Sequence, residues 1–213
     1  QVLYRVAEML EARRAELGAQ VAAAEGVRTS AARRVVDASV DRLVWYAGWS
    51  DKVAQVLGSS NPVAGPYFNF SVPEPTGVIA VLAPRYSSLL GLVSAIAPVV
   101  VTGNSVVVVA SEERPLPAVS FTEVLATADV PAGAVNVLTG RTSELDSVLA
   151  AHMDVNGIDL TGAVPSTRAG LERLAAGNVK RVFAEDDDFA RTPSLRRLRA
   201  FVEIKTVWHP VGT

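Results

Sequence analysis

Side chains capable of covalent or acid–base chemistry are scarce in this sequence. Its 213 residues include no Cys and only two His, His152 and His209. The lack of Cys excludes disulfides, a thiolate nucleophile and Cys-ligated zinc, and two His are too few for a His-rich metal site. No Gly-x-Ser-x-Gly motif marks an activated serine. The sequence therefore offers no nucleophile in a recognisable setting.

Charged residues give little indication of a partner. The densest carboxylate run is Glu-Asp-Asp-Asp at residues 185–188. We expect no metal there, because acidic runs without backbone ligands are usually solvated. The whole chain contains 20 Lys and Arg and 22 Asp and Glu, which gives a net charge of −2. This balance gives no electrostatic reason to expect nucleic acid or an anionic membrane as a partner.

The elements that would position a site begin with two long helices. Apolar residues recur at helical spacing over residues 2–21 and again over residues 31–57, where Ser30 is the expected N-cap. Residues 67–72 then alternate loosely between apolar and polar. They predict an edge or hairpin strand that ends at Pro73 and Pro75.

From Gly77 onward, continuous apolar runs of strand length alternate with helical patterns, one of them capped by Ser166. Strands that are apolar on both faces and alternate with helices indicate a parallel sheet covered on both sides. We therefore predict an α/β fold with a Rossmann-like, doubly wound, mostly parallel sheet and two long N-terminal helices. The strands are expected at residues 78–82, 106–109, 134–138, 157–160 and 179–183.

The C-terminal part departs from this rhythm. A short basic helix is expected at residues 193–199, and residues 201–208 alternate with the period of a strand. A single strand is not stable alone, so this one must pair with something. The chain is thus expected to divide into a helical pair (1–60), a nucleotide-binding-type domain (66–185) that forms one unit with it, and a linker with a closing strand (186–213).

The longest apolar stretch, residues 89–110, is interrupted by Pro98 and by the polar residues 102–105. It therefore predicts a buried helix and a buried strand rather than a membrane span. The N-terminus shows no signal-peptide pattern, which predicts a cytoplasmic protein. The opening Gln1 suggests that the natural chain begins upstream.

The order of these segments resembles the aldehyde dehydrogenase superfamily. VPAGAVNVLTG at residues 130–140 is similar to the family's PPGVVNVVTG run, and FVEIKTVW at residues 201–208 is similar to its closing Y-x-E-x-K-T-V-W strand. The resemblance implies an NAD-binding type of sheet. It also implies that the closing strand belongs to an oligomerisation flap that reaches a neighbouring subunit. Collinear matches extend over residues 75–84, 96–107, 158–162 and 178–182 as well.

The resemblance implies that the catalytic apparatus is missing. In the family, a large catalytic domain with the nucleophilic cysteine precedes the closing strand, but here only residues 186–200 fill that interval. Covalent aldehyde oxidation needs the thiolate. Tyr86 stands where the family has an oxyanion-binding Asn, which removes that donor. The family's general-base Glu falls on Glu185, beside Asp residues instead of L-G-G. We expect Tyr86 and Glu185 to be degenerate positions and no residue to be catalytic.

The cofactor positions implied by the resemblance are only partly kept. Val109 replaces the family's ribose-binding Lys, while Glu112 matches its Glu and Gly162 matches the first Gly of its phosphate-facing turn. Glu112 is either a vestigial ribose ligand or a solvated loop carboxylate. Gly162 is either a phosphate contact or a glycine that the turn itself requires. We expect no cofactor, with NAD as the open possibility.

Three functions remain open from the sequence. The chain could be a structural or regulatory subunit that assembles with an active NAD-dependent aldehyde dehydrogenase or with itself. It could be an NAD(P)-binding oxidoreductase acting on aldehydes with residual or unusual activity. It could also be part of a longer natural chain. For the first function, the resemblance places the contact with the partner on the closing strand, at Phe201, Val202, Ile204, Val207 and Trp208.

Overall fold

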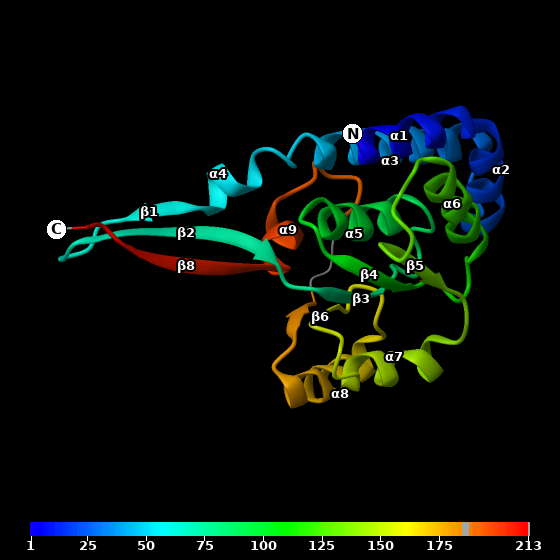
Figure 1. Cartoon of the computed structure of the whole chain (residues 1–213). Coiled ribbons are helices and arrows are strands. Elements are labelled where there is room, and N and C mark those ends of the chain that lie inside the picture. The colour runs from blue at the N-terminus through cyan, green and yellow to red at the C-terminus, as the bar shows by residue number, and fades with distance from the viewer. Residues whose placement is uncertain (185–187, 213) are drawn as a thin grey trace.

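The computed structural model describes residues 1–184 and 188–212. Its larger sheet is parallel and has the strand order β5-β4-β3-β6-β7 (Figure 1). The chain runs outward from β3 to β5 and then returns to the other side of β3, so the doubly wound, Rossmann-like fold is confirmed. The strands are β3 (Val78–Leu82), β4 (Ser105–Val109), β5 (Val135–Leu138), β6 (Gly157–Asp159) and β7 (Arg181–Phe183).

Helices cover both faces of this sheet (Figure 1). Alternate residues of β3 enter the two cores, with Ile79 and Val81 on one side and Ala80 and Leu82 on the other. Because both faces are buried, the strand reads as one continuous apolar run. On the first face lie α5 (Leu90–Val101) and α6 (Leu116–Thr127), with α1 (Val2–Ala12), α2 (Arg14–Glu25) and α3 (Thr29–Ala47) outside them; on the second lie α7 (Thr142–Ala151) and α8 (Pro165–Ala175).

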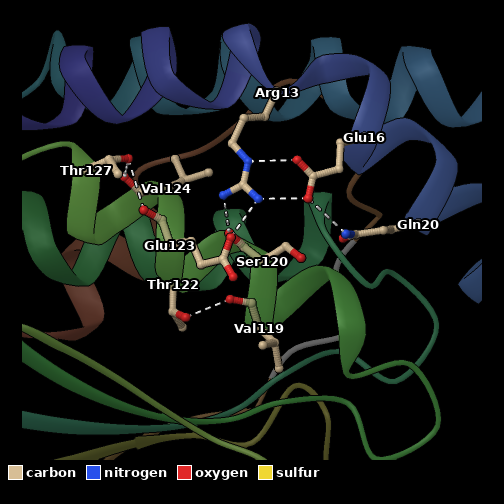
Figure 2. Close-up of polar contacts among 9 residues, drawn as sticks. All are labelled: Arg13, Glu16, Gln20, Val119, Ser120, Thr122, Glu123, Val124 and Thr127. Atoms are coloured by element: carbon tan, nitrogen blue, oxygen red, sulfur yellow. Dashed lines mark hydrogen bonds and ion pairs between the residues drawn. The ribbon is translucent and has the colours of Figure 1, made fainter.

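The first long helix that the sequence predicts is broken at Arg13. The backbone of this residue leaves the helical region, with φ −98° and ψ 17°. Its guanidinium donates to Glu16 (Nε to Oε2, 2.9 Å) and to Glu123 of α6 (Nη2 to Oε2, 2.7 Å), as Figure 2 shows. These hydrogen bonds raise the pKa of Arg13. The break therefore lets one permanently charged side chain join the N-terminal helices to α6.

The second long helix also differs from expectation, since it ends at Ala47 and a turn leads into α4. Neither predicted serine cap is present. Ser30 lies inside α3, which begins at Thr29 with extended Arg28 as its uncapped N-cap residue. Ser166 lies inside α8, which begins at Pro165 because proline is well suited to the first helical position. The short helical segments are α4 (Val53–Leu57), η1 (Ala176–Asn178) and α9 (Arg196–Ala200).

The second sheet projects from the body, and we call it the flap (Figure 1). It is antiparallel, with the order β1-β2-β8, so the closing strand finds its partner within the chain. Contrary to expectation, β2 runs through Pro73 and ends only at Pro75. β1 pairs only with residues 69–71 of β2, so the edge of β2 on the β1 side is open beyond residue 71. A proline there, which lacks an N–H, removes no hydrogen bond between strands. The strands are β1 (Ser59–Asn61), β2 (Tyr67–Pro75) and β8 (Val202–Pro210).

Residues 188–200, which we call the strap, connect the body to the flap. The Arg42 guanidinium of α3 donates to the carbonyl of Phe189 (2.9 Å), and the Tyr46 hydroxyl donates to the carbonyl of Ser194 (3.2 Å). The strap is therefore tied to α3 rather than lying free as a linker. In the described part of the chain, no helix is long and apolar enough to cross a membrane.

Candidate functional site

The carboxyl ends of β3 and β6 meet where the strand order reverses, which is where open α/β sheets bind ligands. A cavity of about 500 Å³ lies there, and we call it the switch-point cavity. Its walls come from the loop after β3, the loop between β6 and α8, and the strap. The lining residues are Pro84, Arg85, Tyr86, Ser87, Thr161, Gly162, Ala163, Pro165 and Phe189.

A second cavity of about 190 Å³ lies beside it, at the carboxyl end of β4 and the start of α7. Arg85 and Gly162 border both cavities, so the two adjoin along the same edge of the sheet. More polar and charged residues line the second cavity than line the first. It is lined among others by Ser111, Glu112, Glu113, Thr142, Ser143 and Asp146.

Tyr86 projects from the loop after β3 and is 66% exposed. The guanidinium carbons of Arg85 and Arg114 lie 5.6 and 5.5 Å from the centroid of its ring, within cation–π range. Arg114 also donates to the Tyr86 carbonyl (2.7 Å), and the hydrogen bond from Arg85 to Glu113 (2.5 Å) raises the pKa of Arg85. The position offers an aromatic ring and a hydroxyl between two cations, but no amide donor.

The loop that carries Tyr86 is held from two sides. The Glu25 carboxylate of α2 accepts from the backbone N–H (2.8 Å) and the hydroxyl (2.7 Å) of Ser88, just before α5. The Ser87 hydroxyl accepts from the backbone N–H of Gly91 (2.8 Å). Gly91 is required because a Cβ there would lie 2.8 Å from the Cβ of Ser87. A carboxylate at this helix N-terminus is also favoured by the helix dipole.

The cofactor positions named from the sequence have structural partners. One Glu112 oxygen accepts from the backbone N–H of Thr142 (2.9 Å), so this carboxylate ties the loop to the start of α7. Val109 is 1% exposed and packs with Leu82 and Leu160. A lysine at that position would need its ammonium to leave this apolar cluster. The ribose-binding pair that the resemblance implies is thus reduced to a carboxylate already engaged elsewhere.

Gly162 is fixed by packing. A Cβ at this position would lie 2.0 Å from the carbonyl oxygen of Ala83, and the Gly162 N–H donates to the Leu82 carbonyl (2.9 Å). These contacts account for a glycine there without a phosphate, as the interpretation as a turn glycine requires. The exposed Thr167 hydroxyl donates to the Val164 carbonyl (3.0 Å) at the start of α8.

Glu185 lies outside the described residues. Of the acidic run, Asp188 is described, and its carboxylate accepts from the Ala190 N–H (3.1 Å) and pairs with Arg191 (3.5 Å). Within residues 1–184 and 188–212, no group of three or more His, Asp or Glu is arranged to hold a metal ion.

Sequence reasoning missed a buried ion pair beside the switch-point cavity. Arg197 of the strap donates to Asp159 at the end of β6 (Nε to Oδ2, 2.6 Å), with side-chain exposures of 5% and 0%. Asp159 also accepts from the N–H and hydroxyl of Thr161, and Arg197 lies over the Phe183 ring at 4.6 Å. A lone Asp at the end of an apolar strand was the available signal.

The residues named for assembly lie in two different environments. Phe201 is fully buried and Val202 nearly so, because the base of β8 enters the chain's own core. Their side chains therefore do not face a partner. Farther out on the flap, Ile204 is 52% and Trp208 is 58% exposed, and Val207 is half-buried.

Comparisons with known proteins agree with this geometry. The model of the aldehyde dehydrogenase family matches residues 1–186. Cytosolic 10-formyltetrahydrofolate dehydrogenase of Xenopus tropicalis is 34% identical over 190 residues, covering 87% of this chain and 21% of that protein. Hydroxyisobutyraldehyde dehydrogenase of Mycolicibacterium austroafricanum is 36% identical over 184 residues, covering 86% of this chain and 36% of that protein.

Solved structures show the same relation. Aldehyde dehydrogenase from Bacillus cereus in complex with NAD+ superposes with a TM-score of 0.78 at 25% identity, covering 85% of this chain and 36% of that one. PnpE from Pseudomonas sp. WBC-3 has a TM-score of 0.78 at 26% identity, covering 85% and 37%. The chain thus spans between about a fifth and two fifths of the length of the proteins it resembles.

Proposed function

The chain belongs to the aldehyde dehydrogenase family, and from that premise we propose that it is a non-catalytic member, a structural or regulatory subunit. Its partner would be an active NAD-dependent aldehyde dehydrogenase, whose assembly it sets or whose aldehyde intermediate it shields. The proposed location is the cytoplasm, since relatives such as the Xenopus protein are named cytosolic.

The observation that carries the proposal is the absence of Cys from all 213 residues. Covalent oxidation of an aldehyde begins with attack by a thiolate. The hydroxyls at the switch-point cavity do not replace it. The Ser87 hydroxyl accepts from the Gly91 N–H, and the Thr161 hydroxyl donates to Asp159. Neither contact supplies a histidine base, and His209 lies on the flap.

The residues at and beside the two cavities do not fit NAD in the manner the resemblance implies. Val109 is packed inside the core, one Glu112 oxygen is committed to α7, and α8 begins with a proline that has no N–H to offer a phosphate. A second candidate, an NAD(P)-binding oxidoreductase acting on aldehydes, is favoured by the cavities of about 500 and 190 Å³ at the expected edge. Calorimetry with NAD+ separates the two, since dissociation constants below millimolar would favour the oxidoreductase.

The flap supports the role in assembly. It projects from the body (Figure 1) and carries exposed Ile204 and Trp208 on its outermost strand. Beyond β8 the described chain supplies no further strand to this sheet. An open, partly apolar edge of this kind is a template for pairing with another chain.

The test is co-expression with a catalytic homologue, followed by size-exclusion chromatography with light scattering. We expect the two proteins to co-elute, and the variant Trp208→Ser to lose the association. The matched control is Val148→Ser, which removes a similarly exposed apolar side chain from α7, away from the flap. Separate elution of the intact proteins, or equal loss in both variants, would contradict the proposal.

A further inference from the structure

Asp146 is a buried carboxylate for which the described part of the chain supplies no cation. It lies in the second turn of α7, and the residue is 8% exposed. Its Oδ1 accepts from the backbone N–H of the next residue, Ser147 (2.6 Å), and among the described residues no other hydrogen bond and no ion pair involves this carboxylate. Burying a charge without a compensating cation costs free energy, and buried carboxylates in proteins are therefore usually paired.

Asp146 borders the second cavity, of about 190 Å³, at the carboxyl end of β4. Glu112 borders this cavity too, and its Oε2 accepts from the backbone N–H of Thr142, four residues before Asp146. Residues four apart lie on the same face of a helix. The two carboxylates therefore lie along the same face of α7, at its start.

The charges around the second cavity do not balance. Its lining contains three carboxylates, those of Glu112, Glu113 and Asp146, and one cation, Arg85. The Arg85 guanidinium is already engaged, because it donates to Glu113 (2.5 Å). The other two carboxylates form no ion pair with any residue that the structure describes. A cleft lined by one sign of charge attracts ligands of the opposite sign.

The adjoining switch-point cavity is of a different kind. It measures about 500 Å³ and is lined mainly by apolar and aromatic residues, among them Pro84, Tyr86 and Phe189. Arg85 and Gly162 border both cavities, so one ligand can extend from the carboxylates into the apolar space. Sites for small molecules are typically apolar, with a few polar groups that fix the orientation of the ligand. The two cavities therefore suit a ligand with a cationic head and an apolar body.

We propose that the two cavities together bind a primary amine, whose ammonium group lies against Asp146 and whose alkyl chain enters the switch-point cavity. An ammonium group has three N–H donors, and the uncommitted oxygens of Asp146 and Glu112 are acceptors for them. Hydrogen bonds between a cation and a carboxylate are about twice as strong as neutral ones. A neutral head group would leave the charge of Asp146 uncompensated, and an anionic one would meet like charges.

Metal ions and adenine nucleotides fit this cavity less well. The described residues form no group of three or more His, Asp or Glu that could hold a metal ion. A nucleotide carries negative phosphate groups, which the two unpaired carboxylates repel. Binding of an amine requires no second protein, so this site does not depend on the proposed function.

Three ligands of equal chain length separate the charge of the head group from the apolar body. Hexylamine, hexanol and hexanoate are titrated into the purified chain at neutral pH and followed by calorimetry. Hexylamine should bind at least about tenfold more tightly than hexanol, as one charge-assisted hydrogen bond predicts, and hexanoate should not bind. No binding of hexylamine, equal affinity for hexylamine and hexanol, or tighter binding of AMP than of hexylamine would overturn the proposal.

The variant Asp146→Asn keeps the size of the side chain and removes its charge. It should weaken the binding of hexylamine about tenfold or more. It should also raise the midpoint of thermal unfolding, because the unpaired buried charge is gone. A carboxylate with only a structural role would not give these two effects together.

The matched control is Glu144→Gln, which removes a carboxylate from the same helix. Glu144 is exposed, pairs with Arg141 and does not line the second cavity, so the affinity for hexylamine should stay unchanged. Equal losses of affinity in the two variants, or an unchanged affinity in Asp146→Asn, would contradict the proposal. If Asp146→Asn fails to fold, the three ligands on the intact chain still decide.

Discussion

Arg197 of the strap and Asp159 at the end of β6 form a buried ion pair. Both side chains are almost fully buried, and both charges have further partners, Thr161 for the carboxylate and the Phe183 ring for the guanidinium. Such a pair adds little net stability over an apolar equivalent. Removal of only one partner, however, strongly destabilises the folded chain, because the other charge is left buried and unpaired. It fixes the strap to the carboxyl end of β6, beside the switch-point cavity.

The first prediction follows from that asymmetry. Arg197→Met should lower the free energy of unfolding by about 3 kcal/mol, because it leaves the Asp159 charge buried without its cation. The matched control is Arg181→Met, which breaks the exposed pair with Glu203 and should cost less than about 1 kcal/mol. Urea denaturation followed by circular dichroism measures both. Equal losses would contradict the assignment of Arg197 as the residue that anchors the strap.

The backbone of Val179 is strained, since its φ of 58° lies in the left-handed region, which a β-branched residue rarely adopts. The side chain is almost fully exposed. Val179→Asn should raise the free energy of unfolding by about 1 kcal/mol, because asparagine tolerates this conformation and no packing is lost. Thermal unfolding provides the measurement. The same change at Val148, which is exposed within α7, should bring no gain, and a loss of stability at Val179 would count against the strain.

At the scale of elements, the buried start of β8 attaches the flap to the body, and a surface contact adds to this attachment. The Arg181 guanidinium of β7 donates twice to the Glu203 carboxylate of β8, at 2.7 and 2.6 Å. The hydrogen bond from Arg181 is the main reason that the pKa of Glu203 is lowered. This contact gives the base of the flap a dependence on pH.

The sign of that dependence is set by the lowered pKa. The contact contributes its full stability above the usual Glu pKa of about 4.5 and loses it as pH falls through the lower pKa of the folded chain. We therefore expect amide exchange in β8 to quicken below about pH 4.5, corrected for intrinsic rates and relative to the buried strand β3. In Glu203→Gln this acid-dependent difference should vanish. A difference that persists in the variant would assign it to another carboxylate.

The elements also show where sequence reasoning succeeds. Residues 78–82 are apolar on both sides, and that pattern alone predicts a buried parallel strand. The failures share one physical cause, which is that local signals were read without the tertiary partner. The helix breaks at Arg13, whose guanidinium bonds to Glu123 of α6, a partner that is distant in the sequence. Pro73 does not end β2, which continues to Pro75, because the edge that Pro73 faces carries no strand beyond residue 71.

The candidate site was harder to predict than the fold. The position of Tyr86 in the loop after β3 follows from the order of segments, but its two flanking guanidiniums do not. Glu112 was expected to be either a vestigial ligand or a solvated carboxylate, and its hydrogen bond from the Thr142 N–H could not be predicted from the sequence. Asp159 gave a visible signal, a carboxyl in an apolar strand, yet Arg197 follows it only after a long intervening segment.

At the scale of the whole molecule, the prediction is the absence of activity. The purified chain, incubated with NAD+ and short aldehydes, should produce no NADH above the rate without protein, because no thiolate is present to begin the reaction. Absorbance at the NADH band measures this, with an active aldehyde dehydrogenase as the positive control. Steady NADH production by the pure chain would contradict the non-catalytic assignment.

The β2·β8 ladder has a consequence for how the chain is made. It joins residue 75 to residue 202 and residue 67 to residue 210, so its loops close across most of the sequence. Contacts of such long range form slowly and late. During synthesis, β2 and its aromatic residues leave the ribosome long before β8. The parallel sheet encoded between them can fold while β2 has no partner on that edge. If synthesis stopped before residue 202, β2 would keep an unpaired edge and exposed aromatic side chains, which are features that chaperones bind.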